Sequence, residues 1–141
     1  MTVPKYDDIE VGLELPERIE PITRADLVRY AGASGDFNII HWNERVAKDV
    51  GLPTVIAHGM LTMARGGRVL TDWVGDPGRV VEYGVRFAGP VPVPDDDAGA
   101  EVVFRAKVAS KLDDRRVRVD LEARCGEEKV LSMARAVVQL D

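Results

Sequence analysis

Two histidines, an aspartate and a glycine in the segment 34–60 are residue types that can move a proton next to a carbonyl group. Residues 34–41 read Ser-Gly-Asp-Phe-Asn-Ile-Ile-His, and residues 56–60 read Ile-Ala-His-Gly-Met. Asp36 and His41 stand five positions apart among turn formers, so a bent loop can aim both side chains at one point. A carboxylate and an imidazole that hold one water supply one acid and one base.

Gly59 opens a long helical pattern, and we expect its backbone amide to face a ligand oxygen. The first amides of a helix have no acceptor within the helix, and the helix dipole favours negative charge there. His58 is expected to brace the loop by hydrogen bonds rather than to do chemistry. Each residue also has a structural interpretation: an Asx turn at Asp36, a satisfied core histidine, and a helix entry that needs a permissive backbone.

Length and composition fit one domain that spans residues 1–141 and folds around a single core. The chain is 45% hydrophobic and 30% charged, with a formal net charge of −5. This balance is ordinary for a globular protein and does not favour nucleic-acid binding. No apolar run approaches the twenty residues of a membrane span, and no leader pattern is present. Cys125 is the only cysteine, so we expect no internal disulfide and a reducing, cytoplasmic location.

Helical patterns occupy the first half of the chain. The sequence predicts a short strand over 13–19, interrupted by Pro16, and then a helix that begins after Thr23 and ends at Gly32. Asp26 stands three residues after Thr23, which is the spacing of a capping box. Asn43 is placed to cap a second short helix that runs to Val50.

The third helical pattern, from Gly59 to Trp73, is the longest and is apolar or small on most of its surface, so we expect it to be buried. The adjacent Gly66 and Gly67 cost about 1 kcal/mol each relative to alanine in a helix interior. Close approach of a strand or a ligand would explain why they are tolerated.

The second half of the chain alternates apolar and polar residues with period two, as strands of an antiparallel sheet do. The predicted strands cover 81–87, 101–108, 116–122 and 130–140, and the turn formers at 113–114 and 126–128 indicate two hairpins. The economical arrangement of these elements is an α+β fold in which a curved antiparallel sheet wraps around the long helix.

The two motifs together resemble the hydratase-2 motif of the MaoC-like dehydratases, and the order of helices and strands resembles a single hot-dog domain. The resemblance implies a fold with a central helix and enzymes that reversibly add water to trans-2-enoyl thioesters, syn, giving (3R)-hydroxyacyl products. It implies that Asp36 and His41 are the catalytic pair, that the Gly59 amide binds the thioester oxygen, and that Ser34 and Asn38 support the loop. We expect no cofactor and no metal ion.

Two positions depart from the pattern of that family. The family usually has proline after the asparagine, whereas this chain has Ile39, which we expect to keep an extended geometry in a somewhat looser loop. Eight residues after Gly59, where some relatives carry a serine, this chain has Gly67.

Three other interpretations of these residues remain open. A thioesterase on the same fold would use a carboxylate and a water to cleave the thioester, and a non-catalytic subunit would only shape an acyl tunnel for a partner. A metal site formed by Asp36, His41 and His58 lacks a recognised ligand spacing. The sequence leaves open the acyl chain length, the carrier (CoA or acyl-carrier protein) and the physiological direction.

The expected assembly is a dimer, because a single hot-dog sheet leaves edge strands with unpaired hydrogen-bonding groups. We expect a homodimer for the isolated chain, and a heterodimer with a related hot-dog subunit is the alternative in the cell.

Overall fold

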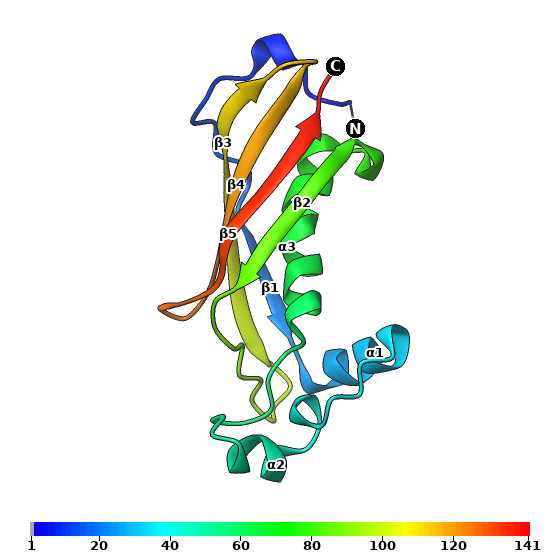
Figure 1. The fold of residues 1–141 in the computed structure, drawn as a ribbon, viewed down its shortest axis with the longest axis vertical. Coiled ribbons are helices and arrows are strands. Elements are labelled where there is room, and N and C mark those ends of the chain that lie inside the picture. Colours follow the sequence, from blue (N-terminus) through cyan, green and yellow to red (C-terminus); the bar gives the residue numbers. More distant parts are fainter. Residues whose placement is uncertain (1) are drawn as a thin grey trace.

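A five-stranded antiparallel sheet packs against one long helix, with two shorter helices at one end. The computed structural model describes residues 2–141. The elements in chain order are β1 (Arg18–Ile22), α1 (Arg24–Ser34), α2 (Glu44–Asp49), α3 (Gly59–Val74), β2 (Val80–Phe87), β3 (Ala100–Leu112), β4 (Arg116–Cys125) and β5 (Glu128–Gln139). Figure 1 shows α3 lying along the sheet, with α1 and α2 gathered near its N-terminal end.

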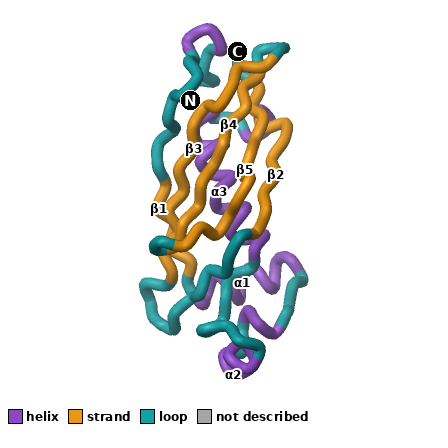
Figure 2. The backbone as a smooth tube through the Cα atoms, turned by 60° about the vertical axis from the view of Figure 1, so that its left-hand side comes forward, coloured by secondary structure: helices purple, strands orange, loops and turns teal. Residues whose placement is uncertain are grey.

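The strands lie in the order β1-β3-β4-β5-β2, and every neighbouring pair is antiparallel. Figure 2 shows this order across the sheet, with α3 behind it. The alternation in sequence explains the two faces: β3 turns Phe104, Ala106 and Val108 inward and keeps Arg105 and Lys107 exposed. The expected α+β architecture is therefore confirmed.

The core lies between α3 and the inner face of the sheet. The helix contributes Leu70 and Val74, which are fully buried, and Val69, which is nearly so. Within the described chain, however, α3 is not buried on all sides as expected. Met60, Ala64, Arg68 and Asp72 recur every four residues and form an exposed stripe, because the sheet covers only one side of the helix.

Local signals located the helix starts well and the helix ends less well. The capping box is present, with Thr23 and Asp26 exchanging hydrogen bonds, and Asn43 caps α2. The prediction that α1 ends at Gly32 is wrong, because the helix continues to Ser34. Gly35 ends it in the left-handed conformation (φ 76°), which glycine adopts without strain.

The first strand is also displaced from its expected position. Residues 13–15 make only isolated pairing with β3, through the Leu15 amide and the Leu13 carbonyl. Pro16 has no amide hydrogen to donate, so regular pairing begins only at Arg18. The remaining strands run longer than predicted but keep their centres and both hairpin turns.

Two further features concern membrane insertion and the two edges of the sheet. Among residues 2–141, no helix is long and apolar enough to cross a membrane. At one sheet edge, β1 is short and contains Pro21, whereas β2 at the other edge is eight residues long and has no proline.

Candidate active site

A chain of side-chain-to-backbone hydrogen bonds shapes the loop after α1. Ser34 Oγ accepts from the Asp36 amide (3.1 Å), Asp36 Oδ1 accepts from the Asn38 amide (3.1 Å), and Asn38 Oδ1 accepts from the Ile40 amide (3.3 Å). Each bond spans two residues, which is the Asx or Ser/Thr turn expected of these residue types. One oxygen of Asp36 thereby fixes the loop, while Oδ2 stays free of it.

Ile39 begins a short 3₁₀ helix, Ile39–His41, rather than occupying the extended conformation expected from sequence. Asn38 before it has φ −55° and ψ 126°, outside the helical region, and caps this turn. The turn carries His41 from the exposed loop to a buried position, where the residue is 8% exposed.

His41 is oriented by a backbone carbonyl. Its Nδ1 lies 2.7 Å from the carbonyl oxygen of Ile56, and because a carbonyl only accepts, Nδ1 carries the proton and donates. The other ring nitrogen, Nε2, lies 4.0 Å from Asp36 Oδ2. That separation is too long for a direct hydrogen bond, but a single water can bond to both atoms. The structure therefore brings Asp36 and His41 to one point.

His58 contacts both His41 and the backbone of Asp36. Its Nε2 donates to the backbone carbonyl of Asp36 (3.0 Å), and its ring stacks on His41 with centroids 3.8 Å apart and planes at 24°. The Tyr30 ring packs edge-on against the His58 ring, with centroids 4.7 Å apart. Burial lowers the pKa of His58 below its ordinary value, so the stacked ring is held neutral.

Gly59 is the first residue of α3, so its amide has no acceptor within the helix. The ring of Phe87 on β2 packs against it closely. A Cβ built on Gly59 would lie 3.0 Å from that ring, so any other residue here would displace Phe87 or the helix start. The glycine therefore lets the Phe87 ring lie close to the helix start.

The inner cavity beside these groups has a volume of about 550 Å³. We use this name for the space lined by Asp36, His41, Gly59 and Thr62 together with mostly apolar residues. The apolar lining comprises Leu52, Ile56, Ala57, Met60, Phe87, Ala88, Gly89, Pro90, Val91, Val130 and Leu131. No arginine or lysine is among these lining residues. The cavity thus combines an acid, an imidazole and a free amide with a wall suited to an aliphatic chain.

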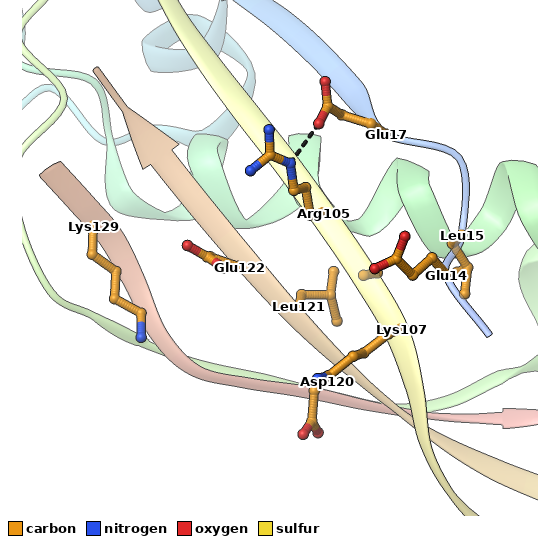
Figure 3. Close-up of a pocket in the computed structure, with 10 residues that line it drawn as sticks. Glu14, Leu15, Glu17, Arg105, Lys107, Asp120, Leu121, Glu122 and Lys129 are labelled. Carbon is orange, nitrogen blue, oxygen red and sulfur yellow. Dashed lines mark hydrogen bonds and ion pairs between the residues drawn. The ribbon is translucent and has the colours of Figure 1, made fainter. Parts of the chain in front are cut away.

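A second hollow, on the face of the sheet away from α3, is of similar size, about 580 Å³. Figure 3 shows its charged lining: Glu14, Glu17, Arg105, Lys107, Asp120, Glu122 and Lys129. We call it the outer hollow. Three of its carboxylates each face an arginine, in the ion pairs Arg105–Glu17, Arg118–Asp120 and Arg124–Glu122.

The residues present do not suit a metal ion, although ligand atoms of Asp36, His41 and His58 lie within 4.8 Å of one another. The lone pair of an imidazole nitrogen lies in the ring plane, and zinc needs lone pairs that converge at about 2.0–2.1 Å. The rings of His41 and His58 are stacked face to face, so their in-plane lone pairs run side by side instead.

Two contributors to the site could not be predicted from the sequence. The carbonyl of Ile56 orients His41, but a backbone acceptor leaves no signal in residue type. Phe87 was predicted only as a strand residue, and its place over Gly59 depends on how β2 is laid against α3.

The fold and this site together define a hot-dog protein with a candidate acid/base pair at the start of its central helix. A family model described as "MaoC like domain" matches residues 12–124. The chain therefore belongs to the family of MaoC-like domains.

Named relatives agree with this family. The chain is 47% identical over 79 residues to "3-hydroxyacyl-thioester dehydratase X" of Mycobacterium tuberculosis, covering 56% of this chain and 27% of that protein. It is 34% identical over 129 residues to the "3-hydroxybutyryl-CoA dehydratase" of Methylorubrum extorquens, covering 89% of this chain and 78% of the relative.

A solved structure of a "MaoC-like dehydratase" superposes with a TM-score of 0.94 at 42% identity, covering 99% of this chain and 43% of that one. The chain thus spans only about a quarter of the mycobacterial relative and under half of this solved chain.

Proposed function

We propose that this chain is a hydro-lyase that adds water reversibly to trans-2-enoyl thioesters and forms (3R)-hydroxyacyl thioesters. The observation that carries the proposal is the 4.0 Å gap between Asp36 Oδ2 and His41 Nε2, beside the amide of Gly59 and an apolar cavity. The dehydratase names of the relatives support the same reaction.

In the hydration direction, a water in that gap attacks C3 of the enoyl group while Asp36 takes its proton. In this direction His41 starts as the imidazolium, with a proton on each ring nitrogen. It delivers the Nε2 proton to C2, while the Nδ1 proton stays bonded to the Ile56 carbonyl. The proton gained by Asp36 then returns to His41, so the pair ends as it began. Both new bonds form on the side of the substrate that faces this pair, which makes the addition syn. Dehydration uses the same groups in reverse.

Charge develops on the thioester oxygen as C3 is attacked, and the amide of Gly59 is the donor proposed for it. Removal of one such donor in other enzymes costs about 10²–10³-fold in rate. The chemistry is proton transfer alone, so the proposal requires no cofactor. The substrate is an acyl thioester of CoA or of acyl-carrier protein, with its chain against the apolar wall of the cavity, as in fatty-acid metabolism.

The direct test follows the enoyl-thioester absorbance of trans-2-butenoyl-CoA and trans-2-dodecenoyl-CoA, while a thiol reagent reports free CoA. Loss of absorbance without thiol release, with a (3R) product on chiral chromatography, is the expected result. Thiol release would instead indicate a thioesterase, and no change with either substrate or with the acyl-carrier-protein thioester would indicate a non-catalytic subunit.

For the isolated chain the proposed assembly is a homodimer paired through β2, and a related hot-dog chain could take the same place. β2 offers a long edge without proline, whereas β1 is short and carries Pro21. Val81 and Phe87 on β2 and Met60 on α3 are exposed apolar residues at this side. Light scattering at micromolar concentration should give twice the chain mass, and a monomeric mass would contradict the proposal.

A further inference from the structure

The first residue of α1, Arg24, bonds to groups on three separate segments. Its Nε donates to the carbonyl oxygen of Val93 at 2.7 Å. Its Nη2 donates to Thr54 Oγ1 at 2.9 Å and lies 3.3 Å from Glu44 Oε1. The Thr54 hydroxyl in turn donates to the same oxygen of Glu44 at 2.8 Å. A planar guanidinium holds several acceptors in one fixed geometry, which a lysine ammonium does not.

Two of these segments, residues 54–57 and 91–93, pair antiparallel, and we call them the short ribbon. Ile56 lies opposite Pro92, and backbone hydrogen bonds of 2.9 and 3.0 Å join the two segments on either side of this pair. Arg24 bonds to the first segment through a threonine hydroxyl and to the second through a backbone carbonyl. It therefore fixes both sides of the short ribbon relative to the start of α1.

Ile56 is the residue through which the short ribbon contacts the turn that carries His41. Its amide donates to the carbonyl of Ile40 at 3.3 Å, and its carbonyl accepts from His41 Nδ1 at 2.7 Å. A shift of the ribbon would move this carbonyl and with it the direction of the imidazole ring. Arg24 is not among the residues that line the inner cavity, so its influence on His41 passes through the backbone of the ribbon.

We propose that Arg24 is a positioning residue of the acid/base pair. By bonding to both sides of the short ribbon, it holds the Ile56 carbonyl where that carbonyl keeps a proton on His41 Nδ1 and aims Nε2 at Asp36. The effect on the rate rests on the proposed function, whereas the effect on the orientation of His41 requires no substrate.

The two histidines of the chain provide an internal reference for the test. In the neutral state His41 carries its proton on Nδ1, where it donates to Ile56, and His58 carries its proton on Nε2, where it donates to the Asp36 carbonyl. Nuclear magnetic resonance of protein with nitrogen-labelled histidine at pH 8 distinguishes these tautomers, and His58→Gln assigns the signals. In Arg24→Gln the His41 signals should move toward those of a mixture of both tautomers, while the His58 signals stay unchanged.

The same variant should lose rate but not substrate affinity. A misplacement of about 1 Å can cost about 10²-fold in rate, so kcat for hydration of a trans-2-enoyl-CoA should fall by about 10-fold to 10²-fold in Arg24→Gln. KM should stay near the parental value, because Arg24 does not line the inner cavity. The ratio kcat/KM should therefore fall as far as kcat does, as expected for a group that acts only in the transition state.

Two milder variants grade the effect. Arg24→Lys keeps the charge and one donor group but not the planar geometry, so its kcat should lie between those of the parent and Arg24→Gln. Thr54→Val removes the bond to the first segment of the short ribbon and should cause the same two changes to a smaller degree. Because both residues belong to one network, Thr54→Val should add little to Arg24→Gln in the double variant.

Arg115 offers a matched control. Its Nη2 donates to a backbone carbonyl, that of Asp141, at 2.8 Å and lies 3.3 Å from a carboxylate oxygen of Asp7. It lies in the turn between β3 and β4, at the opposite end of the sheet from α1 (Figure 1). Arg115→Gln should change neither the histidine signals nor kcat.

The inference is overturned if folded Arg24→Gln keeps the parental His41 signals, whatever happens to its melting temperature. Altered signals with a parental kcat, or an equal response in Arg115→Gln, would overturn it as well. If Arg24→Gln does not fold, Arg24→Lys and Thr54→Val decide by the same criteria. Altered His41 signals in a protein whose parent hydrates no enoyl thioester would contradict the proposed function and leave the role of Arg24 in orienting His41 standing.

Discussion

The inner cavity and the outer hollow are nearly equal in volume, about 550 and 580 Å³, but differ in how their charges are matched. In the outer hollow the carboxylates of Glu17, Asp120 and Glu122 each face an arginine. In the inner cavity no arginine or lysine lines the wall, and Asp36 Oδ2 faces the imidazole of His41 at 4.0 Å. Charges that are already paired have little left to offer a ligand.

The two regions also differ in what fixes their side chains. On the outer face, long flexible side chains meet one another in water, where such pairs contribute little. Around the inner cavity, backbone atoms do the positioning: the Ile56 carbonyl holds His41, and the Asp36 carbonyl holds His58. Size alone therefore does not distinguish the two hollows. Our proposal that the inner cavity is the functional site rests on a few oriented groups beside an apolar wall.

The largest effect is expected from the acid/base pair. Asp36→Asn keeps the size of the side chain but removes the base, and His41→Gln keeps some hydrogen bonding without proton transfer. Each should reduce the rate of hydration of a trans-2-enoyl-CoA by about 10²–10⁴-fold, the usual contribution of such groups. Initial rates and light scattering should show folded, dimeric protein with most turnover lost.

Matched variants in the outer hollow test whether the rate of hydration depends on the inner cavity alone. Arg105→Gln and Glu122→Gln change charges at a hollow of equal size and should leave the rate of hydration unchanged. Near-parental rates in Asp36→Asn and His41→Gln would contradict the assignment of activity to the inner cavity. A comparable loss in the outer variants would contradict it as well.

A smaller loss is expected from Gly59→Ala. The new Cβ would stand 3.0 Å from the Phe87 ring, so the helix start or the ring must move. The amide is retained but displaced, and a misplacement of about 1 Å can cost about 10²-fold in rate. The double variant Gly59→Ala with Phe87→Leu removes the clash and should recover part of the rate. If the double variant is no faster than Gly59→Ala alone, crowding by Phe87 is not the cause.

The sequence was sufficient for the parts of this site that depend on local chemistry. The turn formers around Asp36, the cap at Asn43 and the helix start at Gly59 all act over a few residues, and the structure has them where the pattern indicated. Element boundaries were harder to predict. The start of the first strand after Pro16 depends on strand pairing, and the end of α1 at Gly35, three residues beyond the predicted end, depends on backbone conformation. The stacking of His58 on His41 joins two segments whose approach no local pattern encodes.

Stability rather than turnover is the main expected loss in His58→Gln. The change removes a stacked ring and the bond to the Asp36 carbonyl, and leaving a buried group unpaired costs about 1–3 kcal/mol. Urea unfolding at pH 8 measures this difference.

The same variant should also alter the pH dependence of stability. Because burial lowers the folded-state pKa of His58, the unfolded chain takes up its proton first as the pH falls. The stability that depends on neutral His58 is present above about pH 6.5, the unfolded value, and is lost as the pH falls from there toward the folded pKa. The parent should therefore lose more stability between pH 8 and pH 5.5 than His58→Gln does. Equal losses would mean that His58 titrates normally in the folded protein.

The smallest expected effect is a gain from Ile39→Pro. Ile39 occupies the first position of the 3₁₀ helix, where proline's fixed φ is suitable. Asn38 before it has ψ 126°, outside the helical region that a following proline disfavours. A compatible proline stabilises by about 0.4–1 kcal/mol, chiefly by restricting the unfolded chain. Urea unfolding should show this gain in stability. The gain should be the same when Ile39→Pro is made in the His41→Gln variant. A loss of stability would mean that the loop needs the isoleucine side chain, and that the exposed rim of the inner cavity is held by packing as well as by its turns.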